Sequence, residues 1–387
     1  MTIIAQIGSY AGELASLRHD LHAHPELGFE ETRTAAIVAE KLRGWGIETH
    51  TGIGGTGVVG LVKGKGNGAR RIALRADMDA LPMGEKTGLP YTSKNAGSFH
   101  GCGHDAHTTI LLGTARYLAE TRNFDGTAVL VFQPAEEGRG GARAMLADRI
   151  LERFPFEEIY ALHNEPELAA EQVGIWPGPV AAACDFFDIV IEGAGGHGAY
   201  PHFTKDPVVI AAALVQSLQS IVSRNIDPAQ SGVLSVTQVH AGSAYNVIPG
   251  EARLAGTIRA FSEAGRNLIR DRLRAIAAGI ALAYEVKIGV EINDVFSVLV
   301  NHEAQAAFVA EAARDVVGAE RVLTKPNPSF GSEDFADFLK AVPGAYFLLG
   351  HGGNVPIHNP GFLIDDAILP VGASIFARLI ERRMPLA

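Results

Sequence analysis

The spacing of apolar residues changes twice along the chain, and it predicts three consecutive segments. In the first segment, apolar positions with helical spacing predict an amphipathic helix over Glu30–Trp45 and further helices near residues 105–119 and 141–151. Short apolar runs predict strands over residues 58–62, 72–75, 128–132 and 159–162. Helices and strands that alternate in this way are typical of an α/β domain with a mostly parallel central sheet.

The middle segment has a different order of elements. From Asp185 the pattern predicts strand, helix, strand, strand, helix and strand, over residues 187–191, 206–223, 233–239, 252–260, 263–282 and 285–292. This βαββαβ order is that of ferredoxin-like α+β domains. After about Val295 the α/β pattern resumes, with helices expected over 303–317, 333–340 and 366–383 and a strand over 345–349. We therefore expect a first domain made of residues 1–184 and 296–387, with residues 185–295 inserted into it.

Length and charge narrow the classes of function. A chain of 387 residues is too long for one compact core, because domains usually contain about 100 to 200 residues. The 43 acidic and 33 basic residues give a formal net charge of −10 at pH 7. Such a chain has no basic surface for phosphates or anionic lipids, so we expect neither nucleic acid nor a membrane as a partner. The most apolar stretch, Ala275–Tyr284, is about half the length that a membrane span requires.

The cysteines and the start of the chain bear on the compartment. Cys102 and Cys184 are the only two cysteines, which is too few for a disulfide-rich secreted scaffold. The first residues contain no basic region, and Gln6 and Gly8 interrupt any apolar run, so we expect no signal peptide. We therefore expect a cytoplasmic location.

One glycine motif imitates a dinucleotide-binding site. Gly52–Gly57 has the glycine spacing of the dinucleotide-binding fingerprint. That fingerprint requires a strand before it and a helix after it, whereas here a helix precedes and a strand follows. We interpret the motif as a glycine-rich turn that leads into a strand.

Potential metal ligands occur where the predicted strands end. They are Asp77 and Asp79 after the strand near residue 75, Glu136 and Glu137 after the strand near residue 132, His163 after the strand near residue 162, and His358 in the loop after residue 349. In open α/β sheets, ligands bind at the carboxyl ends of the strands, so these side chains should converge. Cys102 and His104 add a thiolate and an imidazole from a glycine-containing loop. This mixture of ligands suits Zn²⁺ or a borderline ion such as Mn²⁺, Ni²⁺ or Co²⁺.

Each of these residues also has an ordinary interpretation. A single histidine is more often a surface or core residue than a ligand, and we assign no role to the isolated His50, His240 and His302. Glu136 and Glu137 alone would suggest a solvated acidic pair at the start of a helix. Directly after an apolar strand, one carboxylate of the pair can bind metal while the other takes a proton from water. The histidines near residues 19–24 are at most supporting residues.

The motifs that carry these residues resemble those of the dinuclear-metal amidohydrolases of the aminoacylase and carboxypeptidase G family. The closest resemblance is to the branch that contains hippurate hydrolase and the hydrolases of N-acetyl and indoleacetyl amino acids. It covers nearly the whole chain and rests on the following strings, in this order: DLHAHPELGFEE, RADMDALP, HGCGHDAHTT, FQPAEEGRGGA, ALHNEP, GGHGAYPH, NVIPGEARLAGTIRAF, FGSEDFADF and IHNPGF.

The resemblance implies a metallopeptidase-like catalytic domain that binds two divalent metal ions per subunit, Zn²⁺ or Mn²⁺, with Ni²⁺ or Co²⁺ as alternatives. It implies that the metal ligands are Cys102, His104, Glu137, His163 and His358. Glu136 matches the general base, and Asp79 matches the carboxylate that supports the metal site. In the wider family a metal-binding histidine occupies the position of Asp77, and this departure leaves the identity and occupancy of the ions open.

The resemblance also assigns substrate binding. His197, Asn246 and Arg259 match positions that hold the substrate, and Gly331 matches a loop that lines the substrate pocket. In dimeric relatives the histidine can come from the partner subunit, which suggests a homodimer formed through the inserted domain. Without the resemblance, His197 would be an ordinary loop histidine and Arg259 an edge-strand charge.

We therefore expect a metal-dependent amidohydrolase that hydrolyses the amide bond of small N-acyl amino acids to a carboxylic acid and a free amino acid. A metallo-dipeptidase or carboxypeptidase is an alternative, because a peptide is itself an acylated amino acid. A non-catalytic binder of amino-acid conjugates on the same fold is another. The uninterrupted set of ligands together with Glu136 argues against the binder, and no partner for a free α-amino group can be identified for the dipeptidase.

Overall fold

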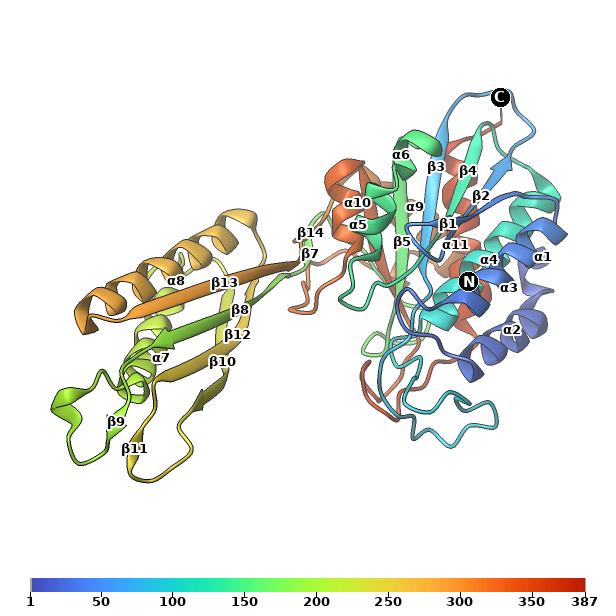
Figure 1. Ribbon diagram of the computed structural model, residues 1–387. Coiled ribbons are helices and arrows are strands. Elements are labelled where there is room, and N and C mark those ends of the chain that lie inside the picture. The colour runs from blue at the N-terminus through green and yellow to red at the C-terminus, as the bar shows by residue number, and fades with distance from the viewer. Residues whose placement is uncertain (1, 387) are drawn as a thin grey trace. The chain divides into compact units, whose positions relative to one another are not determined.

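The computed structural model describes residues 2–386, which form two compact units (Figure 1). The first unit consists of the chain up to Val180, Val300–Asn327 and the chain from Asp334 on. The second unit consists of Ala181–Leu299 and the short segment Pro328–Glu333. The second unit thus begins at Ala181 where we expected Asp185, and it includes a segment that the sequence pattern had assigned to the first domain.

A mixed eight-stranded sheet forms the centre of the first unit. Its strands, in spatial order, are β1 (Glu48–Ile53), β2 (Gly57–Lys63), β4 (Thr127–Gln133), β3 (Arg71–Asp77), β5 (Glu158–Glu165), β16 (Gly344–Gly350), β6 (Val173–Gly174) and β15 (Val322–Leu323). The four central strands, β4, β3, β5 and β16, run parallel to one another. Strands β1 and β2 are antiparallel additions at one edge, and β6 is antiparallel to β16. The expected mostly parallel central sheet is therefore confirmed.

Helices cover both faces of this sheet (Figure 1). The large apolar core lies on one face and includes α1 (Ala5–Gly8), α2 (Ala11–Ala23), α3 (Thr32–Gly44), α4 (His104–Thr121), α9 (Glu303–Val317) and α11 (Ile368–Arg383). Helices α5 (Gly141–Ala147) and α10 (Phe335–Ala341) pack together on the other face. A separate two-stranded sheet joins β7 (Gly178–Ala181) to β14 (Leu299–Asn301).

Several local expectations need correction. The helix expected near residues 141–151 is broken into α5 and α6 (Ile150–Arg153), because Arg149 between them has a left-handed backbone with φ 61°. Strand β3 continues to Asp77 and β5 to Glu165, so Asp77 and His163 lie within the last residues of their strands and not after them. The Gly52–Gly57 motif forms the turn between β1 and β2, so a strand and not the expected helix directly precedes it, and a strand follows it as expected, where the dinucleotide fingerprint requires a helix. At Gly54, with φ +63°, a side chain would also lie 2.6 Å from the backbone nitrogen of Met145.

The second unit is a four-stranded antiparallel sheet with two helices. Its strands, in spatial order, are β10 (Gly232–Ala241), β12 (Glu251–Ala260), β8 (Ala183–Glu192) and β13 (Lys287–Phe296). This arrangement, with α7 (Pro207–Arg224) and α8 (Glu263–Tyr284), is the expected ferredoxin-like order. Both helices begin at a side-chain cap, Asp206 for α7 and Ser262 for α8. A short two-stranded ribbon pairs β9 (Gly196–His197) with β11 (Val247–Ile248).

Helix α7 is a longer apolar stretch than Ala275–Tyr284, which we expected to be the most apolar part of the chain. By length and composition alone it could cross a membrane. One side of the helix, however, lies in the apolar core of the second unit, through Ile210, Leu214, Leu218 and Ile221. The three- and four-residue spacing of these positions is that of a helix packed on a sheet.

Candidate metal centre

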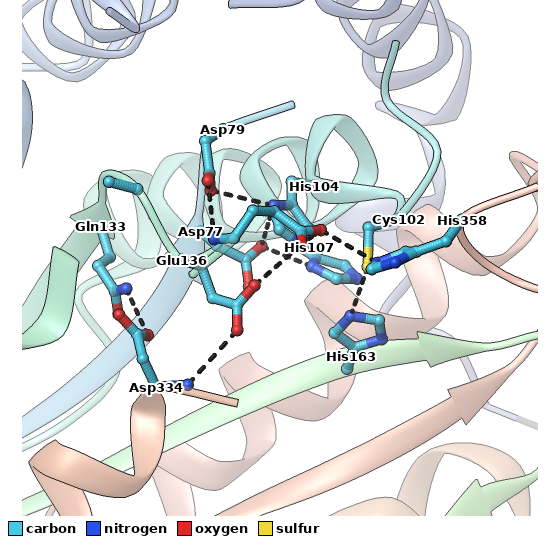
Figure 2. A network of polar contacts seen from close by, with 12 residues as sticks. Asp77, Asp79, Cys102, His104, His107, Gln133, Glu136, His163, Asp334 and His358 are labelled. Atoms are coloured by element: carbon cyan, nitrogen blue, oxygen red, sulfur yellow. Dashed lines mark hydrogen bonds and ion pairs between the residues drawn. The ribbon is translucent and has the colours of Figure 1, made fainter. Parts of the chain in front are cut away.

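The predicted metal-site residues of the first unit converge at the carboxyl ends of its parallel strands (Figure 2). Three overlapping groups of side chains each place their ligand atoms within 4.8 Å of one another. The groups are Cys102, His104 and His163; Cys102, Glu137 and His358; and His104, Glu136 and Glu137. Because the groups share members, they form one continuous cluster of sulfur, nitrogen and oxygen atoms.

Cys102 and His163 form one side of this cluster. The Cys102 Sγ atom lies 3.4 Å from His163 Nε2. The other ring nitrogen of His163, Nδ1, lies 2.7 Å from the backbone oxygen of Asn164, to which it donates a hydrogen bond. This bond places the proton on Nδ1 and leaves the lone pair of Nε2 toward the cluster. Burial and the neighbouring His107 lower the pKa of His163 well below its usual range, which favours the neutral imidazole that metals bind.

His104 follows the same pattern at the start of α4. Its Nδ1 atom lies 3.2 Å from Asp79 Oδ1, so the carboxylate orients the ring and directs Nε2 to the cluster. The Nε2 atom lies 4.0 Å from Glu136 Oε2 and 3.9 Å from Glu137 Oε1. It is buried and has no hydrogen-bond partner among the described residues.

The turn after β4 supplies both glutamates. Ala135 has a left-handed backbone with φ 54°, which is unusual for a residue with a side chain. The turn is held by hydrogen bonds from Ala135 N to the buried Glu31 carboxylate (2.8 Å) and from Gly141 N to Ala135 O (3.0 Å). The backbone amide of Glu137 donates to Asp79 Oδ2 at 2.9 Å. Asp79 therefore orients both His104 and the glutamate turn.

His358 completes the cluster from the loop after β16. Its backbone is left-handed, with φ 61°, and its amide donates to the carbonyl oxygen of Gly101 at 2.8 Å. Its Nε2 atom lies 3.3 Å from Glu137 Oε1. The loop that carries Cys102 thus holds the backbone of His358, which is why two distant parts of the sequence meet here.

The electrostatics of the cluster fit bound cations. Burial and the charges of Glu137 and Glu136 raise the pKa of the Cys102 thiol well above its usual range. Burial alone lowers the pKa of His104, but the neighbouring carboxylates, first among them Asp77, outweigh it and raise the pKa to about 10. The Oε1 atom of Glu137 is buried without a hydrogen-bond partner among the described residues. An excess of negative charge and two buried polar atoms that make no hydrogen bond among the described residues are what a divalent metal would satisfy.

Asp77 has a different environment from Asp79. Its carboxylate lies 2.6 Å from Arg75 Nη1 and 2.6 Å from His107 Nδ1. Burial raises its pKa, but His104, His107 and Arg75 outweigh this effect and hold the pKa well below its usual range. Asp77 is therefore an ionised, fully buried partner of protein groups. His107 was not among the predicted site residues, although its position three residues after His104 on one helix face indicated a shared environment.

The predicted substrate-binding residues all lie in the second unit, in two pairs. His197 pairs with Val247 between β9 and β11, and the adjacent Gly198 N donates to Asn246 O at 2.8 Å. Arg259 donates to Ser332 Oγ at 2.7 Å, next to Gly331. The two groups lie toward opposite ends of β12. His197 comes shortly after Glu192, the last residue of β8, which lies opposite Glu251 at the start of β12. Arg259 lies near the other end of β12, opposite Cys184. Eight residues of β-strand correspond to roughly 25 Å.

Comparison with known proteins places this chain in a family. Residues 73–382 match Peptidase family M20/M25/M40. The chain is 41% identical over 379 residues to the hippurate hydrolase of Campylobacter jejuni, with 98% of each chain covered. It is 40% identical over 373 residues to the N-acetyl-L-cysteine deacetylase of Bacillus subtilis, which covers 96% of this chain and 88% of the deacetylase.

A solved structure agrees with these relatives. A Bacillus subtilis protein described as a dinuclear metal binding peptidase of the M20 family superimposes with a TM-score of 0.85 at 34% identity, covering 97% of this chain and 99% of that chain. These matches confirm the resemblance that the ordered sequence motifs indicated. The clustered ligands lie within a chain that is similar to its relatives along nearly its whole length, and the protein belongs to Peptidase family M20/M25/M40.

Proposed function

We propose that the protein is a metal-dependent amidohydrolase that cleaves the amide bond of N-acyl amino acids. The observation that carries the proposal is the position of Glu136, which lies within the cluster of sulfur, nitrogen and oxygen atoms and places its Oε2 atom 4.0 Å from His104 Nε2. The hydrolase and deacetylase names of the relatives support the same class of substrate. The products are a carboxylic acid and a free amino acid.

Five residues would hold two divalent ions: Cys102, His104, Glu137, His163 and His358. A thiolate, three imidazoles and a carboxylate favour Zn²⁺ or Mn²⁺, with Ni²⁺ or Co²⁺ as alternatives. When bound, such ions act as Lewis acids that acidify water and polarise a carbonyl oxygen.

The residues of the chain then divide the remaining work. Glu136 removes a proton from the attacking water and later delivers it to the nitrogen of the leaving amino acid, so the proton is conserved over the reaction. Asp79 keeps His104 and the glutamate turn in place through its two hydrogen bonds. Arg259 binds the substrate carboxylate, and His197 donates to the oxyanion that develops on the carbonyl oxygen when water adds to the carbonyl carbon.

We further propose that the protein works as a homodimer formed through the second unit, with His197 supplied by the partner copy. The distance of roughly 25 Å between the His197 and Arg259 ends of β12 supports this arrangement, because one small substrate does not extend over it within one copy. Strand β10 is an edge of its sheet. The outer side of α7 also exposes Val208 and Val209, and both features are typical of surfaces that bind another chain.

Two experiments test these proposals. The first measures hydrolysis of N-benzoyl, N-acetyl and indoleacetyl amino acids by protein stripped with a chelator and reloaded with Zn²⁺, Mn²⁺, Ni²⁺ or Co²⁺. Release of free amino acid that depends on added metal is expected. Absence of hydrolysis with every metal and acyl group, by protein that binds metal, would overturn the proposed activity.

The second experiment mixes two inactive variants, His197→Ala and Glu136→Gln, under conditions that allow subunit exchange. If His197 acts across the dimer, each hybrid contains one complete site, and equal amounts of the two variants recover about a quarter of the unsubstituted activity. If both residues act within one copy, no hybrid has a complete site and the mixture stays inactive.

A cytoplasmic location is also proposed, which the two free cysteines support.

A further inference from the structure

A buried residue outside the proposed ligand set connects two of its members. Asn164 follows His163 in β5 and is 1% exposed. Successive side chains of a strand point to opposite faces, so Asn164 turns away from the ligand cluster and toward α4. It contacts both Cys102 and His163, through its side-chain amide and its backbone oxygen respectively.

Four hydrogen bonds define this connection. The side-chain amide of Asn164 donates from Nδ2 to the carbonyl oxygen of Cys102 at 2.5 Å. The backbone oxygen of Asn164 accepts from His163 Nδ1 at 2.7 Å. The backbone amide of Asn164 donates to His107 Nε2 at 3.0 Å, and its side-chain Nδ2 lies at 3.0 Å from the same atom. One residue thus holds the backbone of the cysteine and the ring of the histidine.

The orientation of Asn164 follows from its neighbours. Arg75 donates to the Asp77 carboxylate at 2.6 Å, and the backbone N–H of Asn164 points at His107 Nε2, so Nε2 carries a lone pair and His107 donates from Nδ1 to Asp77. That lone pair accepts from the backbone N–H of Asn164. The carbonyl of Cys102 is also an acceptor, so the amide must present its NH₂ group, and a flipped amide would place two oxygens face to face. Each hydrogen bond in the series Arg75, Asp77, His107 and Asn164 therefore joins a donor to an acceptor.

The loop that carries Cys102 is shaped to fit this residue. Gly103 has φ +91°, and a Cβ atom at that position would lie 2.4 Å from Asn164 Nδ2. Only glycine allows both the left-handed backbone and the close approach of the amide. The loop and Asn164 are thus packed against each other directly beside the cysteine.

We propose that Asn164, held by His107, is the positioning residue that sets the Cys102 thiolate and the His163 imidazole at the distance that a shared metal ion requires. The inference rests on the proposed metal centre. Residues that hydrogen-bond to metal ligands, without binding the metal themselves, typically contribute about 10- to 100-fold to metal affinity. Loss of the Asn164 side-chain amide should therefore weaken metal binding and alter the contact between the Cys102 thiolate and the metal, while the fold remains.

Cobalt alone is the probe for the test. The metal-stripped full-length protein is titrated with Co²⁺, and both the affinity and the thiolate-to-cobalt charge-transfer absorption are recorded. Asn164→Ala removes the amide but keeps the backbone bonds to His107 and His163, and a fall in Co²⁺ affinity of about 10- to 100-fold with a weaker or shifted absorption is expected. Asn164→Asp, of the same size, is measured in parallel and decides the question if the alanine variant does not fold.

Thr114→Val is the matched control. Thr114 is a fully buried polar residue farther along α4, and its hydroxyl donates to the carbonyl oxygens of Ile110 and Ala373. It should lose stability but retain the cobalt affinity and absorption. The positioning role would be overturned if the Asn164 variants had the same Co²⁺ affinity and absorption as the unsubstituted protein. It would also be overturned if Thr114→Val lost as much Co²⁺ affinity as they do. If the unsubstituted protein shows no thiolate-to-cobalt absorption, the proposed metal centre itself fails.

Discussion

The carboxylate of Asp79 joins His104 to the backbone of Glu137. Its Oδ1 atom lies 3.2 Å from His104 Nδ1, and its Oδ2 atom accepts from Glu137 N at 2.9 Å. Both partners donate a hydrogen bond, so the residue at this position must accept two hydrogen bonds, one on each oxygen. The imidazole and the glutamate that we propose as metal ligands are thereby oriented by the two oxygens of one side chain.

Asp79→Asn should weaken metal binding with little change in size at the site. The asparagine presents one NH₂ group where an acceptor is needed, so it opposes either the His104 ring or the Glu137 amide. We expect metal affinity to fall about 10- to 100-fold, measured by titration with a competing chelator. Asp271→Asn, which makes the same charge change at a side chain that is 78% exposed, should have no effect. Equal affinities for both variants would show that Asp79 does not orient the ligands.

Glu136→Gln should separate catalysis from metal binding. The amide keeps the size of the side chain but cannot take a proton, so kcat should fall by ~10²- to 10⁴-fold. Metal content, measured by elemental analysis, should stay at the unsubstituted level because Glu136 is proposed as the base and not as a ligand. A variant that loses both metal and activity would instead assign Glu136 to the ligand set.

Arg259→Ala should impair substrates that carry a free carboxylate more than their amide analogues. Loss of one side of a charge-assisted pair typically costs about 2 to 5 kcal/mol, so kcat/KM should fall by tens- to thousands-fold for the carboxylate forms. The already poor amide analogue should barely change. Arg253→Ala is the matched control, because Arg253 lies on the same strand and its side chain is 62% exposed. Equal losses for both substrate types would make Arg259 a structural residue.

Glu158 should govern stability in acid. It binds Arg383 of the last helix and accepts from Tyr160. Burial raises its pKa, but Arg383 and Tyr160 outweigh that effect and lower it below the usual range. The unfolded chain therefore binds more protons, so this stabilisation is complete above the unfolded pKa of about 4.3 and is lost as pH falls through the lower folded value.

Glu158→Gln tests that contribution. We expect the variant to lose about 1 to 3 kcal/mol at neutral pH and to show a shallower decline of unfolding free energy in acid. Chemical denaturation across this pH range measures both quantities. Glu40→Gln, at an exposed position, should reproduce the unsubstituted curve. A Glu158→Gln curve that stays parallel to the unsubstituted one would place the acid-sensitive group elsewhere.

Sequence patterns predicted β2, β3, β4, β5 and β16 because these strands are apolar runs. They missed the polar strand β1 and the two-residue strands β6 and β15, which carry no such run. They did not predict α2, because its buried face carries Arg18 and His22. Both side chains bond to the buried Asp105 and thereby interrupt the apolar spacing. The interval between His104 and His107 is visible in the sequence, but the contact of Asn164 with α4 is not, since it depends on how a strand and a helix pack. The separation of His197 from Arg259 likewise required the register of β12.

The insertion of the second unit also has a consequence for synthesis on the ribosome. Strand β5 is made before Ala181–Leu299, whereas its parallel neighbour β16 is made after that segment. The inserted unit has a core of its own, so it can fold while one edge of β5 still lacks its partner. Unpaired strand edges bind other chains readily, and long-range parallel pairing is slow. The nascent chain is therefore most vulnerable to aggregation between the emergence of β5 and the arrival of β16, and we expect chaperones to matter most during that interval.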